Sequence, residues 1–154
     1  FTPRDAFSPQ ITIDAPVQIP EDYVPDLDLR MGLYRRLNDL EDAQAIEAFA
    51  AELIDRFGKL PSSTENLLTL IRIKQNCVKA GIARLDVGAK GALVSFHNDQ
   101  FANPTGLIDY VQRLQGTAKL RPDNKLVISR AWKDAAARLH AGLQLSSGLA
   151  KVAG

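Results

Sequence analysis

The hydrophobic period of this 154-residue chain changes near Gly81, and that change constrains the fold more than any other feature. Before Gly81, apolar residues recur every three or four positions, which is typical of amphipathic helices. After it, short alternating segments predict strands that are separated by turns and by two further helices. Helices that precede a small strand-and-helix unit indicate an α+β fold.

The first half predicts an N-terminal edge strand and three helices. Alternating apolar residues over 11–19 predict the strand, and Pro16 restricts it to a sheet edge or to two short pieces. Asp42 is expected to cap the second helix, and Gly58 to end it with a positive φ. The three helices are expected over residues 26–40, 42–57 and 62–80.

The second half predicts a ββαββα unit with a small antiparallel sheet. The turn residues at 88–91 and at 122–124 predict two hairpins. Asn103 and Pro104 predict the start of the intervening helix. The expected strands are 82–87, 92–96, 119–121 and 126–129, and the expected helices are 103–116 and 131–149.

The domain organisation follows from length and composition. Residues 1–10 contain two prolines and are expected to be linker, whereas 11–154 are expected to form one domain with halves 11–81 and 82–154. The chain begins at Phe1 and is interpreted as a piece of a longer protein. Its single cysteine suits a reducing compartment, and no apolar run approaches the ~20 residues of a membrane span, so a cytoplasmic location is expected.

Charge is distributed unequally along the chain. Residues 1–77 carry 8 basic and 13 acidic side chains, a net charge of −5, whereas residues 78–154 carry 11 and 5, a net charge of +6. Opposite charges on one small domain suit docking onto other protein surfaces.

The residue types that carry catalysis do not form a recognisable constellation. His97 and His140 lack a second ligand at helical spacing, and Cys77 lies among apolar residues, which predicts a buried thiol. The loop 88–91 lies between two strands and lacks the Gly-Lys-Ser/Thr ending of a phosphate-binding loop. We therefore expect no catalytic, metal-binding or cofactor-binding residue in this domain.

A basic segment over residues 119–138 offers an alternative function, which is contact with nucleic acid. Trp132 is its only aromatic residue and is expected on the apolar face of the last helix, so a solvated face is the preferred interpretation. The cations of this segment are Lys119, Arg121, Lys125, Arg130, Lys133 and Arg138.

The second helix carries an acidic pair opposite its apolar stripe. Glu52 and Asp55 lie one turn apart beside small alanine side chains, an arrangement that could receive an arginine of a partner protein. The competing interpretation is that Glu52 pairs with Arg56 at i+4 and that both side chains face water. Helix geometry alone favours this second interpretation.

Four short motifs carry a resemblance to a known family. They are IPEDYVPD at 19–26, LYRRL at 33–37, ELIDRFGKLP at 52–61 and NLL at 66–68. Together they closely resemble the C-terminal domain of the bacterial transcription-repair coupling factors (Mfd family). The resemblance is close from about Ile11 to Gly81 and looser beyond, and the family more often has lysine where Arg35 stands.

The resemblance implies a parent protein that is an ATP-driven translocase on double-stranded DNA. Such a parent removes stalled RNA polymerase and recruits the excision-repair machinery, using ATP and Mg in motor domains outside this chain. The resemblance further implies that this domain is not catalytic and contacts no membrane. It would dock on the parent's own N-terminal UvrB-like module, hide the surface that recruits UvrA, and restrain the motor. DNA would be bound through other domains.

The resemblance shifts the interpretation of the acidic pair toward a docking contact. Arg30 and Arg36 either bridge the first two helices or face the partner, and the sequence leaves both possibilities open. The residues expected to dock are Glu52, Asp55, Arg56, Arg30 and Arg36. The residues expected to have structural roles are Tyr34, Phe57, Gly58 and Pro61.

Overall fold

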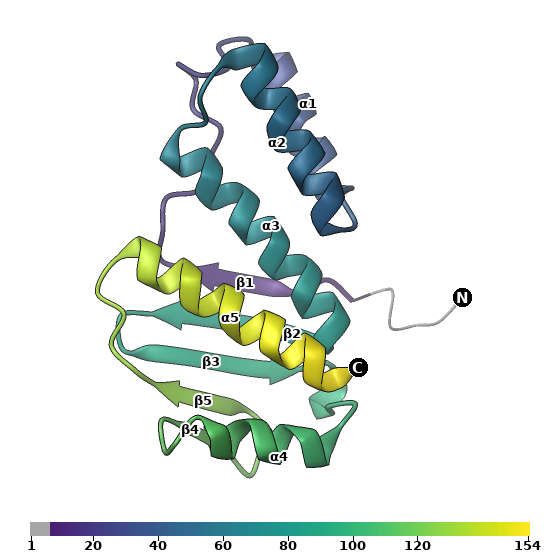
Figure 1. Cartoon of the computed structure of the whole chain (residues 1–154), viewed down its shortest axis with the longest axis vertical. Coiled ribbons are helices and arrows are strands. Elements are labelled where there is room, and N and C mark those ends of the chain that lie inside the picture. Colours follow the sequence, from purple (N-terminus) through teal and green to yellow (C-terminus); the bar gives the residue numbers. More distant parts are fainter. Residues whose placement is uncertain (1–6) are drawn as a thin grey trace. The chain divides into compact units, whose positions relative to one another are not determined.

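The computed structural model describes residues 7–154, which divide into two compact units (Figure 1). The helical unit contains residues 16–75, and the sheet unit contains the residues before 16 together with Asn76–Gly154. Residues 1–6 of the expected linker lie outside the described residues, and its last residue, Gln10, begins a strand.

The helical unit contains α1 (Leu27–Asn38), α2 (Ala43–Phe57) and most of α3 (Ser62–Ala80). These three helices confirm the predicted ones to within a few residues. The Asp42 side chain accepts a hydrogen bond from the Ala45 N–H at 2.8 Å, so it caps α2 as expected. The core of the unit is aliphatic and aromatic, and its most buried members include Val24, Leu33, Leu37, Phe49 and Leu53.

An irregular segment, residues 16–25, is held in the helical unit by hydrogen bonds to the helices. The Gln18 N–H donates to the Ser63 carbonyl at 3.2 Å, and the Thr64 hydroxyl donates to the Gln18 carbonyl at 2.9 Å. The Ile19 N–H donates to the Tyr34 hydroxyl at 2.6 Å. These partners replace a strand ladder, so both backbone polar groups of Gln18 and the N–H of buried Ile19 are paired without regular secondary structure.

The sheet unit contains five strands in the order β1-β2-β3-β5-β4. The strands are β1 (Gln10–Ile13), β2 (Ile82–Gly88), β3 (Gly91–Phe96), β4 (Ala118–Leu120) and β5 (Leu126–Ser129). The first strand lies at an edge, as predicted, but it pairs with β2 in parallel, so the sheet is mixed. A parallel pairing is possible because the helical unit, not a tight hairpin, connects these two strands. Strand β1 also ends at Ile13, before Pro16, and not at residue 19.

Side chains on alternate positions of β2, β3 and β5 are buried, which identifies one face of the sheet as the core face. Helix α5 (Ala135–Ala153) packs on β1 and β2, whereas α4 (Pro104–Arg113) packs on β4 and on α5 (Figure 1). A short 3₁₀ turn, η2 (His97–Asp99), follows β3. The predicted α+β class is therefore confirmed.

The last helix begins later than the sequence predicts. The Asp134 side chain accepts a hydrogen bond from the Ala137 N–H at 2.8 Å and caps α5 there. The preceding backbone instead follows the β2–β3 turn, since the Trp132 N–H donates to the Ala89 carbonyl at 2.9 Å. Trp132 thus precedes the helix and is half-buried, which corrects the expectation that it lies on the apolar face of α5.

Candidate docking site on the first two helices

A cluster of three charged side chains joins α1 to α2. The Glu52 carboxylate accepts two hydrogen bonds from the Arg36 guanidinium, each 2.7 Å long, and one from Arg56 at 2.9 Å. Arg36 therefore bridges the first two helices, which is one of the two possibilities that the sequence left open. The i+4 pair of Glu52 with Arg56 is present as well, so this carboxylate is occupied within the domain.

The electrostatics of the cluster favour its charged form. Hydrogen bonds from Arg36 and then from Arg56 lower the pKa of Glu52 from its ordinary 4.5 to about 2, against a smaller opposing effect of burial. The hydrogen bond to Glu52 likewise raises the pKa of Arg36. Both guanidinium groups also lie over aromatic rings, Arg36 over Phe49 and Arg56 over Phe57, each 5.0 Å from the ring centroid. The cluster is held in place by its own domain.

Asp55 differs from Glu52, since its carboxylate is exposed and forms no ion pair or hydrogen bond with another described residue. Ile54 beside it is 50% exposed. The stripe centres on fully buried Leu53, and the next residue turns ~100° away from it. Two exposed alanines lie on the same helix, Ala51 one turn and Ala48 two turns before Asp55. We call this surface the α2 patch, which consists of Ala48, Ala51, Ile54 and Asp55.

The end of α2 is fixed by Tyr23 and Gly58. The Tyr23 hydroxyl donates to the Gly58 carbonyl at 2.8 Å and lies 3.2 Å from the Leu53 carbonyl. Phe57 packs at a tilt on the Tyr23 ring, with centroids 5.7 Å apart. Gly58 has φ +95° and ψ −165°, a conformation that is essentially restricted to glycine. This confirms the positive φ that the sequence predicted.

The remaining sequence-predicted residues stabilise neighbouring backbone. Arg30 donates to the Val24 carbonyl at 2.8 Å, so it holds the segment before α1 and does not bridge the helices. Pro61 accepts hydrogen bonds from the Thr64 and Glu65 N–H groups at 3.0 Å and so begins α3. Tyr34 holds Ile19, as described above.

The basic segment is partly neutralised by its own domain. Arg121 pairs with Asp123 at 2.9 Å, and Arg138 pairs with Asp14 at 3.3 Å while only 14% of its side chain is exposed. Arg138 also donates to the Trp132 carbonyl at 3.0 Å. Two of the six cations are therefore engaged.

Other reactive side chains are also engaged or isolated. His97 stacks on Phe7 with ring centroids 4.4 Å apart, and burial raises the pKa of the Cys77 thiol to about 12. Within residues 7–154, no three potential metal-ligating side chains form a group that could hold an ion. No helix in this range is both long and apolar enough to cross a bilayer.

The fold defines a class: an α+β domain in which a helical unit separates the first two strands of a mixed sheet in sequence. The sequence profile of the TRCF domain matches residues 13–107, and the chain belongs to this family. This confirms the resemblance that the four motifs carry.

Curated relatives agree with this assignment. The chain is 42% identical over 122 residues to the transcription-repair-coupling factor of Rickettsia bellii, a match that covers 79% of this chain and 11% of that protein. It is 32% identical over 118 residues to the Escherichia coli factor, covering 73% and 10%. The chain thus spans about a tenth of the length of these relatives.

A solved structure supports the fold. The crystal structure of the C-terminal domain of a transcription-repair coupling factor superposes with a TM-score of 0.79, covering 95% of this chain and 94% of that one. The identity is 20%, so this likeness concerns architecture.

Proposed function

We propose that this domain regulates a bacterial transcription-repair coupling factor through reversible docking. In this proposal the domain docks on the parent's N-terminal UvrB-like module, masks the surface that recruits UvrA, and restrains the DNA translocase. The domain itself is not catalytic and has no cofactor. ATP and Mg belong to the motor domains, RNA polymerase and DNA are contacted elsewhere in the parent, and the parent acts in the cytoplasm.

The observation that carries the proposal is the α2 patch. Half of the Ile54 side chain faces water and would be buried in an interface, and the neighbouring Asp55 carboxylate is exposed and available to an arginine of the partner. The neighbouring alanines leave room for a partner's side chains to approach. Glu52 supports this surface indirectly, because its ion pair with Arg36 joins α2 to α1.

The experiment reverses the charge of Asp55 alone. The Asp55→Arg variant should bind the purified N-terminal module at least about tenfold more weakly by calorimetry, because like charges would then meet. In the full-length parent, the same variant should bind UvrA more tightly. Its melting temperature should equal that of the wild type, since Asp55 is exposed.

The matched control is Glu41→Arg, which changes an equally exposed acid just before α2 and should alter the affinity less than about twofold. Equal affinities of wild type, Asp55→Arg and control would contradict docking through the α2 patch. Weakening by both variants to the same extent would indicate long-range charge attraction without a defined contact.

A further inference from the structure

A cavity of about 490 Å³ lies in the sheet unit, among α4, β5 and the middle of α5. Its volume falls within the range of small-ligand pockets. The floor is apolar and consists of side chains that are buried or half-buried, namely Leu114, Ile128, Ala141 and Leu145. An apolar floor of this size suits one large aliphatic or aromatic side chain.

Two aromatic residues line the cavity, and both are fixed by the fold. The ring of Tyr110 lies against α5 at Gly148, where an added Cβ would come within 2.9 Å of the ring. Trp132 is held at both backbone polar groups, since its N–H donates to Ala89 and its carbonyl accepts from Arg138. The fold therefore fixes the backbone of Trp132 and packs the Tyr110 ring on α5.

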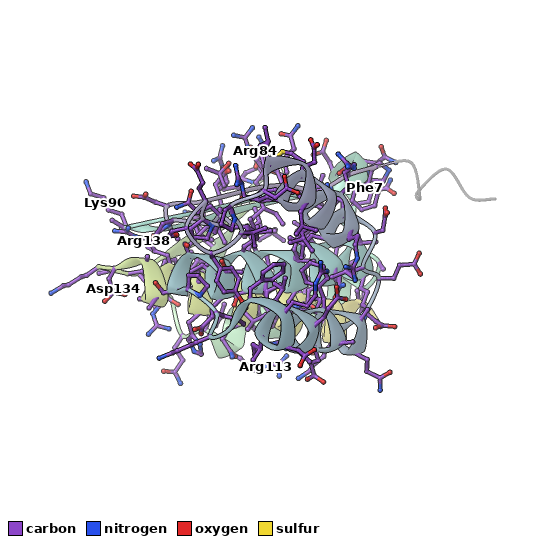
Figure 2. All side chains as sticks on the ribbon, turned by 90° about the horizontal axis from the view of Figure 1, so that it is seen from above. Phe7, Arg84, Lys90, Arg113, Asp134 and Arg138 are labelled. Atoms are coloured by element: carbon purple, nitrogen blue, oxygen red, sulfur yellow. The ribbon has the colours of Figure 1, made fainter. Side chains whose placement is uncertain are left out.

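The polar residues that line the cavity are cationic or neutral. Arg130, His140 and Gln144 lie among its lining residues, and none of those residues is acidic. The whole of α5 lacks aspartate and glutamate, and the acid that precedes it, Asp134, caps the helix. Figure 2 shows Asp134 and Arg138 at the same end of the sheet unit as Lys90, with Phe7 at the opposite end. With Arg130 as a cation and no acid among its lining residues, the cavity favours an anionic occupant.

We propose that this cavity binds an acidic peptide segment of a partner protein. One large apolar side chain of the segment enters between Tyr110 and Trp132, and a neighbouring carboxylate pairs with Arg130. The buried aliphatic residues of the floor favour an apolar side chain over a base, which would have only the polar residues at the edge of the cavity as hydrogen-bonding partners. The proposal concerns a surface separate from the α2 patch and does not depend on docking there.

Trp132 is the only tryptophan of the chain, so its fluorescence reports on this cavity alone. The probe is a short labelled peptide in which aspartate and glutamate surround a Leu-Phe pair. Its binding to the 154-residue chain, followed by anisotropy, should shift the tryptophan emission to shorter wavelength. A peptide of equal charge with serines at the apolar positions should bind about tenfold more weakly.

Two variants locate the contact. Arg130→Glu should weaken binding of the Leu-Phe peptide by about tenfold or more, whereas Lys119→Glu, an exposed cation of β4 outside the cavity, should change it less than about twofold. Equal binding of the two peptides, equal loss in both variants, or no emission shift would each overturn the proposal. Preference for a single-stranded thymidine oligonucleotide over the peptide would overturn it in favour of nucleic acid.

Discussion

At the scale of single residues, Glu52 is the side chain whose ionisation is most closely connected with stability. Its pKa is lower in the folded domain than in the unfolded chain, so its ion pairs stabilise the fold above the ordinary pKa of 4.5. This contribution is lost as the pH falls from 4.5 toward about 2, where the carboxylate becomes protonated. Because a third of the side chain is exposed, solvent screening keeps the effect modest.

Glu52→Gln should therefore lower the free energy of unfolding by about 1 kcal/mol at neutral pH, since one bidentate contact and one single contact become uncharged. Urea denaturation at pH 7 and at pH 2 measures the difference, which should nearly vanish at the lower pH. Glu47→Gln, an exposed site on the same helix, should have no such effect. A pH-independent difference would show that the ion pairs do not stabilise the domain.

At the scale of the secondary-structure elements, helix ends explain why the chain turns where it does. Gly58 ends α2 in a conformation that other residues rarely adopt, whereas Gly32 lies inside α1 with ordinary helical geometry. An added Cβ would meet no atom within 4 Å at Gly58, and only the end of the Arg35 side chain at 3.8 Å at Gly32. A side chain at Gly58 would therefore be disfavoured by backbone strain, whereas steric crowding disfavours a side chain at neither glycine.

The two Gly→Ala substitutions should have opposite signs. Gly58→Ala should destabilise the domain by about 1–3 kcal/mol through strain at a positive φ. Gly32→Ala should stabilise it by about 0.5–1 kcal/mol, because alanine favours the helix and restricts the unfolded chain. Chemical denaturation of both variants measures the two shifts, and destabilisation by Gly32→Ala would contradict this account.

Most helices and strands could be predicted from the sequence, because their ends are set by capping and turn residues that lie close to them in the chain. Asp42, Gly58 and Asn103 set helix ends through caps and dihedral angles that are readable in sequence. Capping residues did not predict the start of α5 correctly. The expected start was residue 131, whereas the helix begins at Ala135 after the Asp134 cap. The acidic pair was found from helix geometry, but the bridge from Arg36 to Glu52 joins residues 16 apart, and i+4 rules cannot reveal such a contact.

At the scale of the whole chain, charge is separated along the sequence although the net charge is only +1. Two cations of the basic segment are already paired, Arg121 with Asp123 and Arg138 with Asp14. The affinity of nonspecific DNA binding depends on the number of phosphates that the protein neutralises. Because Arg121 and Arg138 are paired within the domain, they contribute less to that affinity.

We expect duplex DNA to bind the 154-residue chain weakly at low salt and not measurably at ~0.15 M salt. Four remaining cations of the segment would give a logarithmic salt dependence no steeper than about −4. Anisotropy titrations of a labelled duplex across salt concentrations measure this slope. Tight binding that persists at moderate salt would instead support the nucleic-acid alternative.

The irregular segment 16–25 has a consequence for local opening on the timescale of hydrogen exchange. The Ile19 amide lies in no helix or strand, yet it is bonded to the Tyr34 hydroxyl and its side chain is 2% exposed. Its exchange with deuterium should therefore be as slow as that of the α2 core amides, because release requires the helical unit to open. Tyr34→Phe should accelerate exchange at Ile19 while leaving the Leu53 amide protected. Rapid exchange at Ile19 in the wild type would show that this segment opens independently of the helices.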